Sequence, residues 1–232
     1  MHQCSKIDEF LKGARRILPL MIAVVPVGAV FGAVAATKGL SPAEATLMSA
    51  LVFAGGSQFV AMDIWTHPAS WVSVGFAALL VNLRHVLMGF SIIPKLERFS
   101  KWQKATSLLF LADEIWAVAE FHGRQTRLTF SWFAGAVMPF YSAWVLSALL
   151  GAMLGSGIGD AAVLGLDFAF PAVFIILIMG FWKGRDTGRV LLASAGCALI
   201  VQYFIPGVWY IAAGAVGGML ASAVSPRRAV ET

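Results

Sequence analysis

The sequence carries little charge. Only 12% of its 232 residues are Asp, Glu, Lys or Arg, whereas 59% are hydrophobic. A soluble domain needs roughly 25% charged residues, so this composition excludes an ordinary soluble enzyme and a disordered chain. It also excludes a nucleic-acid-binding face, which needs basic residues clustered on a soluble fold. The composition predicts an integral membrane protein whose main partner is the lipid bilayer.

Cysteine pairs and catalytic motifs are also missing. The two cysteines, Cys4 and Cys197, show neither CxxC nor zinc-binding spacing. The histidines form no HExxH pattern, and no GxSxG nucleophile motif is present. The sequence therefore predicts no metal or other cofactor, and we expect no enzymatic function.

Long apolar runs predict an all-α membrane protein with about eight transmembrane helices, some broken or re-entrant. A crossing needs about 20 apolar residues, and the runs lack the alternation of a β-barrel. We expect a cytoplasmic N-terminal segment (1–16), one transmembrane domain (17–226) and a short cytoplasmic tail (227–232). The run 190–226 is too long for one crossing and is predicted to turn at Pro206-Gly207. The other candidate runs are 17–37, 45–62, 64–83 with its continuation 85–94, 105–121, 128–159 and 161–182.

The distribution of Lys and Arg leaves the path of residues 45–94 open. The N-terminus, 122–127, 183–189 and the tail are basic, which indicates the cytoplasmic side. Eight simple crossings place all four of these basic segments on the cytoplasmic side, but they place the basic segment 95–104 outside. Either that segment is an exception, or a segment within 45–94 enters the membrane and returns on the same side.

Four charged residues lie inside apolar runs: Arg84, Asp113, Glu114 and Asp167. Each costs about 2.5–3.5 kcal/mol at a helix centre when unpaired, so we expect Arg84 to pair with Asp113 or Glu114. Such a pair indicates either a substrate or proton site, or an ion pair that only fixes helix packing. At the ends of the runs, solvated carboxylates are expected for Glu44, Asp63, Glu120 and Asp160.

Two interruptions of the apolar pattern predict broken helices. One is Gly55-Gly56-Ser57-Gln58, and the other is Asp167-Phe-Ala-Phe-Pro-Ala-Val-Phe174, in which Pro171 removes a helix hydrogen bond. Transporters bind substrates at broken helices, where free N–H groups hold carboxylates. The two interruptions occupy the second and sixth runs, as an internal four-plus-four repeat would place them. The alternative for Gly55-Gly56 is close helix packing, which is also our reading of Gly28-x-x-x-Gly32, Gly151-x-x-x-Gly155 and Gly214-x-x-x-Gly218.

Four segments in order resemble motifs of the AzlC (YgaZ-like) family. They are Phe53-Ala-Gly-Gly-Ser-Gln-Phe-Val60 for AGxSQF, Asn82-Leu-Arg-His-Val-Leu-Met-Gly-Phe-Ser91 for RHxLxGxS, Leu111-Ala-Asp-Glu-Ile-Trp-Ala117 for TDE, and Asp167-Phe-Ala-Phe-Pro-Ala-Val-Phe174 for FxxPAxF. The third segment departs from the family, because Ala112 stands where Thr is usual. The resemblance covers nearly the whole chain.

The resemblance implies the large subunit of an exporter of branched-chain or similar apolar amino acids in the bacterial cytoplasmic (inner) membrane. It also implies a partner, a small membrane subunit of the AzlD (YgaH) type, and export driven by protons is compatible with the carboxylates. A channel, a transporter for another small solute and a non-transporting assembly subunit stay open as alternatives. The backbone around Gly55 is expected to hold the substrate carboxylate, an acidic residue its ammonium group, and Phe53, Phe170 and Trp116 its side chain. The predicted substrate-binding residues are Gly55, Gly56, Ser57, Gln58, Arg84, Asp113, Glu114, Trp116 and Asp167.

Overall fold

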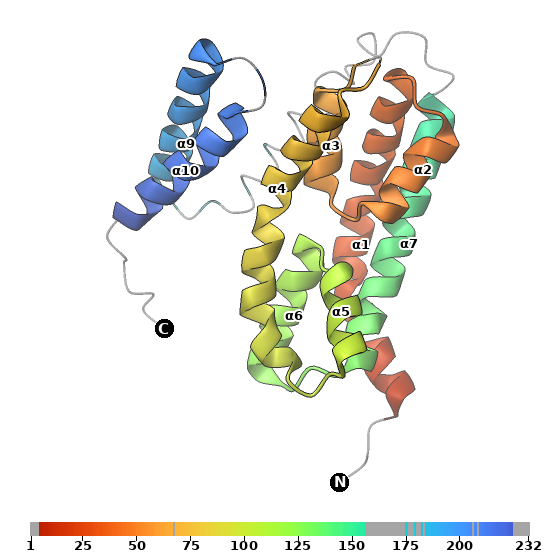
Figure 1. Cartoon of the computed structure of the whole chain (residues 1–232). Helices are drawn as coiled ribbons and strands as arrows, with labels where there is room; N and C mark the ends of the chain where they lie inside the picture. Colours follow the sequence, from red (N-terminus) through yellow and green to blue (C-terminus); the bar gives the residue numbers. More distant parts are fainter. Residues whose placement is uncertain are drawn as a thin grey trace. The chain divides into compact units, whose positions relative to one another are not determined.

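The computed structural model describes residues 5–66, 68–155, 184–205 and 209–224, together with residues 175, 179, 182 and 207. Within them the chain forms only helices and turns, so the predicted all-α fold is confirmed (Figure 1). The helices are α1 (Lys6–Thr37), α2 (Pro42–Leu51), α3 (Gly55–Asp63), α4 (Trp71–Ile92), the 3₁₀ turn η1 (Ile93–Leu96), α5 (Lys101–Leu109), α6 (Asp113–Gln125), α7 (Phe130–Gly155), α9 (Arg185–Phe204) and α10 (Trp209–Val224). Four of the described segments are long and apolar enough to cross a membrane: α1, α4 with η1, α7 and α9.

The chain divides into two compact units. The first consists of Met1–Asp63 and Asn82–Asp167, and the second of Ile64–Val81 and Phe168–Thr232. The candidate site lies in the first unit, which is described first.

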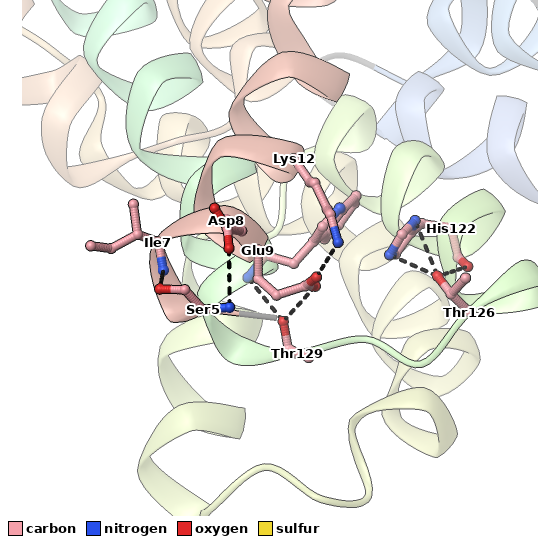
Figure 2. Close-up of polar contacts among 9 residues, drawn as sticks. Ser5, Ile7, Asp8, Glu9, Lys12, His122, Thr126 and Thr129 are labelled. Carbon is pink, nitrogen blue, oxygen red and sulfur yellow. Dashed lines mark hydrogen bonds and ion pairs between the residues drawn. The ribbon is translucent and has the colours of Figure 1, made fainter. Parts of the chain in front are cut away.

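Helix α1 starts at Lys6, well before the run predicted from residue 17. The Ser5 side chain accepts a hydrogen bond from the backbone N–H of Ile7 (3.3 Å), and Asp8 accepts one from the Ser5 N–H (3.1 Å), as Figure 2 shows. Asp8 and Glu9 also place negative charge in the first turn, which stabilises a helix N-terminus. This capping box extends the helix into the polar N-terminal segment.

Helices α1 and α7 form the core of the first unit and run parallel. Their glycines allow the two backbones to touch, and a Cβ at Gly32 would overlap the carbonyl oxygen of Ala148. The predicted packing role of the first two glycine pairs is therefore confirmed. The successive contacts are Gly13 with Trp132, Gly28 with Ser147, Gly32 with Ala148, Gly151 with Ala29, and Gly155 with Ala33.

Helices α2 and α3 form a hairpin that enters from one end of the unit and returns to it. Gln58 Nε2 donates to Ser49 Oγ at 3.1 Å. Nine residues of a continuous helix would span about 13.5 Å, so the chain reverses between these two residues. The Tyr141 hydroxyl donates to the carbonyl of Ala50 at 2.9 Å, which places the tip of the hairpin beside the middle of α7. The predicted broken helix is thus confirmed, but the break lies at Val52–Ala54, just before the predicted Gly55–Gln58, and it is the turn of a re-entrant hairpin.

Helices α5 and α6 form a second hairpin, which enters from the opposite end. The ring of Phe99, just before α5, lies 5.8 Å from that of Phe130, the first residue of α7. The ring of Phe110, just after α5, lies 5.3 Å from that of Tyr141. Helix α5 therefore rises along α7 to its middle. Helix α6 then returns, because His122 stacks on Trp132 near the start of α7.

One expectation about the apolar runs is corrected here, and another is confirmed. The run 105–121 is not one helix, since the chain breaks between α5 and α6. The run 64–83 does continue into 85–94, because α4 (Trp71–Ile92) passes through Arg84 and His85 without a break. The helix tolerates Arg84 there because its charge is paired within the unit.

The hairpins explain why the basic segment 95–104 lies on the same side as the basic N-terminus and residues 122–127. Because α2–α3 enters and returns, the segment after α4 lies at the same end of the unit as the N-terminus and the start of α7. We call this the basic end. Its Lys and Arg residues are Lys6, Lys12, Arg15, Arg16, Lys95, Arg98, Lys101, Lys104, Arg124 and Arg127. The second of the two paths left open by the sequence is therefore the one the chain takes.

In the second unit, α9 and α10 pack as an antiparallel pair. A Cβ at Gly217 would lie 2.5 Å from Cys197 Sγ, and one at Gly214 would lie 3.3 Å from the Ser194 carbonyl oxygen. The turn between the helices contains Gly207 with φ +103°. The predicted turn and the packing role of the third glycine pair are confirmed; Pro206 lies outside the described residues.

Candidate functional site

An ion pair joins α4 to the start of α6. Arg84 Nη1 lies 2.7 Å from Asp113 Oδ2, with side-chain exposures of 39% and 29%. Asp113 and Glu114 occupy the first turn of α6, where the partial positive charge of the helix N-terminus favours a carboxylate. Neighbouring residues of a helix project about 100° apart, so Glu114 projects from a different side of α6. The predicted pairing of Arg84 is confirmed, and its partner is Asp113.

The same turn of α4 carries polar atoms that remain unpaired. Among the described residues, Arg84 Nε, Asn82 Oδ1 and His85 Nδ1 are buried and have no hydrogen-bond partner. Buried polar groups without a partner are costly, and clusters of them call for a water, an ion or a ligand. This turn of α4 is thus equipped to bind a polar group.

The N-terminus of α3 lies at the tip of the first hairpin. The first helical backbone bond is donated by Gln58 to the carbonyl of Ala54. The N–H groups of Gly55, Gly56 and Ser57 come before it and therefore have no acceptor within α3. A Cβ at Gly55 would lie 3.0 Å from the Trp144 ring, so this glycine also permits close packing. The predicted binding and packing explanations for the glycines are compatible.

Gln58 has a different environment. Its side chain is fully buried, its Nε2 donates to Ser49, and its Oε1 accepts from Trp144 Nε1 at 3.1 Å. These bonds connect both arms of the first hairpin to α7. Gln58 therefore positions the α3 N-terminus.

The two hairpin tips meet through aromatic rings. Phe53 lies in the turn before α3 and Phe110 in the turn before α6, and their ring centroids are 6.4 Å apart. Tyr141 of α7 contacts both in edge-to-face geometry, at 5.1 Å and 5.3 Å. We call these three residues the tip rings. Phe110 and Tyr141 were missed at the sequence level, because their proximity to Phe53 depends on the tertiary fold.

Trp116 holds α6 against α4. Its Nε1 donates to Ser91 Oγ at 2.7 Å, and Ser91 in turn donates to the Met88 carbonyl. The indole is thus fixed on the α4 side of α6, one turn beyond Asp113. Its predicted contact with a substrate side chain remains a prediction.

The returning end of α6 is fixed at the basic end. Lys95 Nζ lies 2.7 Å from Glu120 Oε2, and the Glu120 residue is only 7% exposed. The expectation of a solvated Glu120 is therefore wrong, because Lys95 follows α4 to the basic end and pairs with it. Arg16 lies over the Phe121 ring at 4.9 Å. Burial lowers the pKa of His122, whose ring also contacts Thr126 at 2.9 Å (Figure 2).

The other residues of the predicted site are placed as follows. Asp167, Phe170 and Pro171 lie outside the described residues, as does the second interruption with its proposed repeat. Among the described residues, no hydrogen bond or ion pair joins the Gly55–Gln58 turn to Arg84 or Asp113. The two groups are related through the contact between Phe53, two residues before Gly55, and Phe110, three residues before Asp113.

Comparison with known proteins identifies the family. The family model described as AzlC protein matches residues 19–158. An uncharacterized membrane protein of Archaeoglobus fulgidus is 34% identical over 95% of this chain and 97% of its own length. The inner membrane protein YgaZ of Escherichia coli is 31% identical over 93% of this chain and 90% of its own length. The branched-chain amino acid transport protein AzlC of Bacillus subtilis is 25% identical over 84% of this chain and 76% of its own length.

No solved structure matches the chain. The chain is therefore an integral membrane protein and belongs to the AzlC family, a family of membrane transport proteins.

Proposed function

We propose that this chain is the large subunit of an exporter for branched-chain or similar apolar amino acids, and that it acts with a small AzlD-type membrane subunit. The observation that carries the proposal is the contact between Phe53 and Phe110, which brings together the turns before the N-termini of α3 and α6, with the Arg84–Asp113 pair at the start of α6. Broken helices that meet within the membrane are typical substrate sites of transporters. The name of the Bacillus subtilis relative supports the substrate class.

The chemistry of an apolar amino acid fits these groups. Its carboxylate needs hydrogen-bond donors, which Arg84 and the N–H groups of Gly55, Gly56 and Ser57 supply. Its ammonium group needs a carboxylate, for which Asp113, Glu114 and Asp167 are the candidates. Phe53 and Trp116 supply apolar surface for the side chain, and Gln58 holds α3 in place. A carboxylate that binds a proton during the cycle would couple export to the proton gradient.

We place the basic end in the bacterial cytoplasm, since Lys and Arg concentrate on the cytoplasmic side. With this orientation the N-terminus is cytoplasmic and α2–α3 enters from the outside. Export then proceeds from the α5–α6 hairpin toward the α2–α3 hairpin.

The test is efflux of preloaded labelled leucine, valine and methionine from cells. The chain alone, the chain with an AzlD-type partner, and empty vector are compared at matched membrane levels. Faster leucine or valine efflux that requires the partner supports the proposal. Efflux equal to the vector control, with both proteins in the membrane, contradicts the proposed substrate class. Flux that does not saturate and ignores substrate chirality would instead indicate a channel.

A further inference from the structure

We infer that the tip rings Phe53, Phe110 and Tyr141 are the central barrier of the permeation path, and that Tyr141 is the positioning residue that holds both hairpins closed. The inference rests on the proposed transport function, but it concerns where the path is sealed rather than what passes through it.

The barrier is built from both hairpins. Each hairpin leaves the helical conformation only briefly, at Val52–Ala54 in the first and Phe110–Ala112 in the second. Both turns lie beside the middle of α7, as the bond from Tyr141 to Ala50 and the contact between Tyr141 and Phe110 show. Each turn supplies one ring, and the two rings meet at 6.4 Å.

Non-helical backbone at this depth must be shielded from lipid. Backbone N–H and C=O groups that face lipid without a hydrogen bond cost several kcal/mol each, so such turns occur only where protein or a water-filled cavity surrounds them. The polar groups at the tips, including the free N–H groups of α3 and the Arg84–Asp113 pair, follow the same rule. The turns are therefore shielded from lipid, and the polar groups beside them favour a polar route, across which the rings lie, over a purely apolar core.

The burial of the tip rings supports this placement. Phe53, Phe110 and Tyr141 are all half-buried. The neighbouring core rings Phe31, Phe59 and Phe140 are enclosed, with 0–2% exposure. Rings that only filled the core would be enclosed in the same way.

Tyr141 contacts both hairpins through different parts of its side chain. Its hydroxyl bonds the Ala50 carbonyl at the end of α2, and its ring touches Phe53 and Phe110. Movement of α2–α3 would break the hydroxyl bond and open the path toward the end opposite the basic end. Movement of α5–α6 would break the contact with Phe110 and open the path toward the basic end. The two hairpins are thus alternating gates that close on one residue of a fixed helix.

The test is a leak assay that does not depend on the natural substrate. The full chain, with its small partner where efflux requires it, is reconstituted in vesicles, and urea entry is followed by light scattering. The wild-type protein should be no more permeable than empty vesicles. The F53A/F110A variant should raise urea permeability about tenfold, because the lost edge-to-face contacts shift a closed–open equilibrium by roughly that factor. The matched control is F99A/F130A, which removes the ring pair at the basic end and should not leak.

Two further measurements keep the inference testable if F53A/F110A does not fold. Y141F keeps the ring but removes the bond to Ala50, and it should raise the urea leak less than F53A/F110A does. In a C4S/C197S background, a short reversible thiol cross-linker between F53C and F110C should reduce leucine efflux below that of the same variant before cross-linking, and reduction of the linker should reverse the loss. The F99C/F130C cross-link should leave efflux unchanged.

The results separate this inference from the proposed function. A folded F53A/F110A variant without a urea leak, or undiminished efflux with cross-linked tips, would overturn the barrier. A urea leak in a protein that never moves leucine would keep the barrier and reject the proposed substrate class.

Discussion

Arg84 of α4 and Asp113 of α6 form an ion pair of 2.7 Å at the point where the second hairpin turns back. The pair connects a membrane-crossing helix to a re-entrant one, next to the ring contact between the two hairpin tips. The residues that bear charge are thus located where the backbone is least regular. Substrate sites in broken-helix transporters have the same combination.

The first prediction concerns this pair. R84A and D113N should each reduce amino acid efflux by about tenfold to a hundredfold, because hydrogen bonds to charged groups contribute about 1.5–3 kcal/mol. The measurement is efflux at matched membrane levels. The controls are R98A and D63N, which remove exposed charges from the ends of helices.

A charge swap tells a binding role from a packing role. The R84D/D113R variant restores the ion pair but reverses its direction. If the pair only fixed helix packing, the swap would recover both thermal stability and efflux. We expect it to recover stability alone, because a substrate carboxylate would then meet a carboxylate in place of the guanidinium.

The second prediction concerns the N-cap of α6. Ala112 occupies this position and makes no side-chain capping bond. A112S supplies the missing acceptor and should stabilise the protein by about 0.5–2 kcal/mol, seen as a higher Tm in detergent. The matched control is A105S at an exposed position inside α5, where the same change should lower stability slightly. A lower Tm for A112S would show that the site has no room for the hydroxyl.

The sequence predicted those features of the fold and site that depend on local chemistry. Composition determined the helical membrane class, Gly55 and Gly56 indicated the first break, and the cost of an unpaired charge predicted that Arg84 pairs with Asp113 or Glu114. The break between α5 and α6 was missed because the segment before Asp113 contains neither Gly nor Pro. The start of α5 was nevertheless visible in the sequence, since Ser100 and Gln103 form the same capping box as Ser41 and Glu44 in the first hairpin.

The convergence of the tips could not be predicted in this way. A straight helix and a hairpin of two half-helices show the same apolar composition, and only the packing against α7 distinguishes them. The contact between Phe53 and Phe110, 57 positions apart in the sequence, depends on Tyr141 lying between them. The burial of Glu120 depends likewise on the return of α6 to Lys95.

The third prediction concerns the contact between α1 and α7. G32A should lower stability by about 1–3 kcal/mol, because the added methyl group would overlap the Ala148 carbonyl oxygen. G75A in α4 is the matched control, since a Cβ there meets no atom within 4 Å. Because alanine loses less backbone entropy on folding than glycine does, G75A should be neutral or should stabilise the protein by about 0.5–1 kcal/mol. Equal Tm values for the two variants would contradict the close approach of α1 and α7.

The last prediction concerns pH and His122 at the basic end. Burial lowers the pKa of His122 in the folded protein, and the nearby Arg16 and Lys12 lower it further, while Glu9 opposes them. The unfolded chain, with a histidine pKa of about 6.5, therefore binds the proton at a higher pH than the folded protein does. The contribution of neutral His122 to stability is complete above that pKa and is lost as the pH falls through the folded pKa. The Tm of the wild-type protein should accordingly drop more between pH of about 8 and about 5.5 than the Tm of H122Q, which keeps polar atoms near Thr126 but does not titrate. A pH dependence of equal size in both proteins would mean that another group is responsible and that the stacking of His122 on Trp132 tolerates the charged ring.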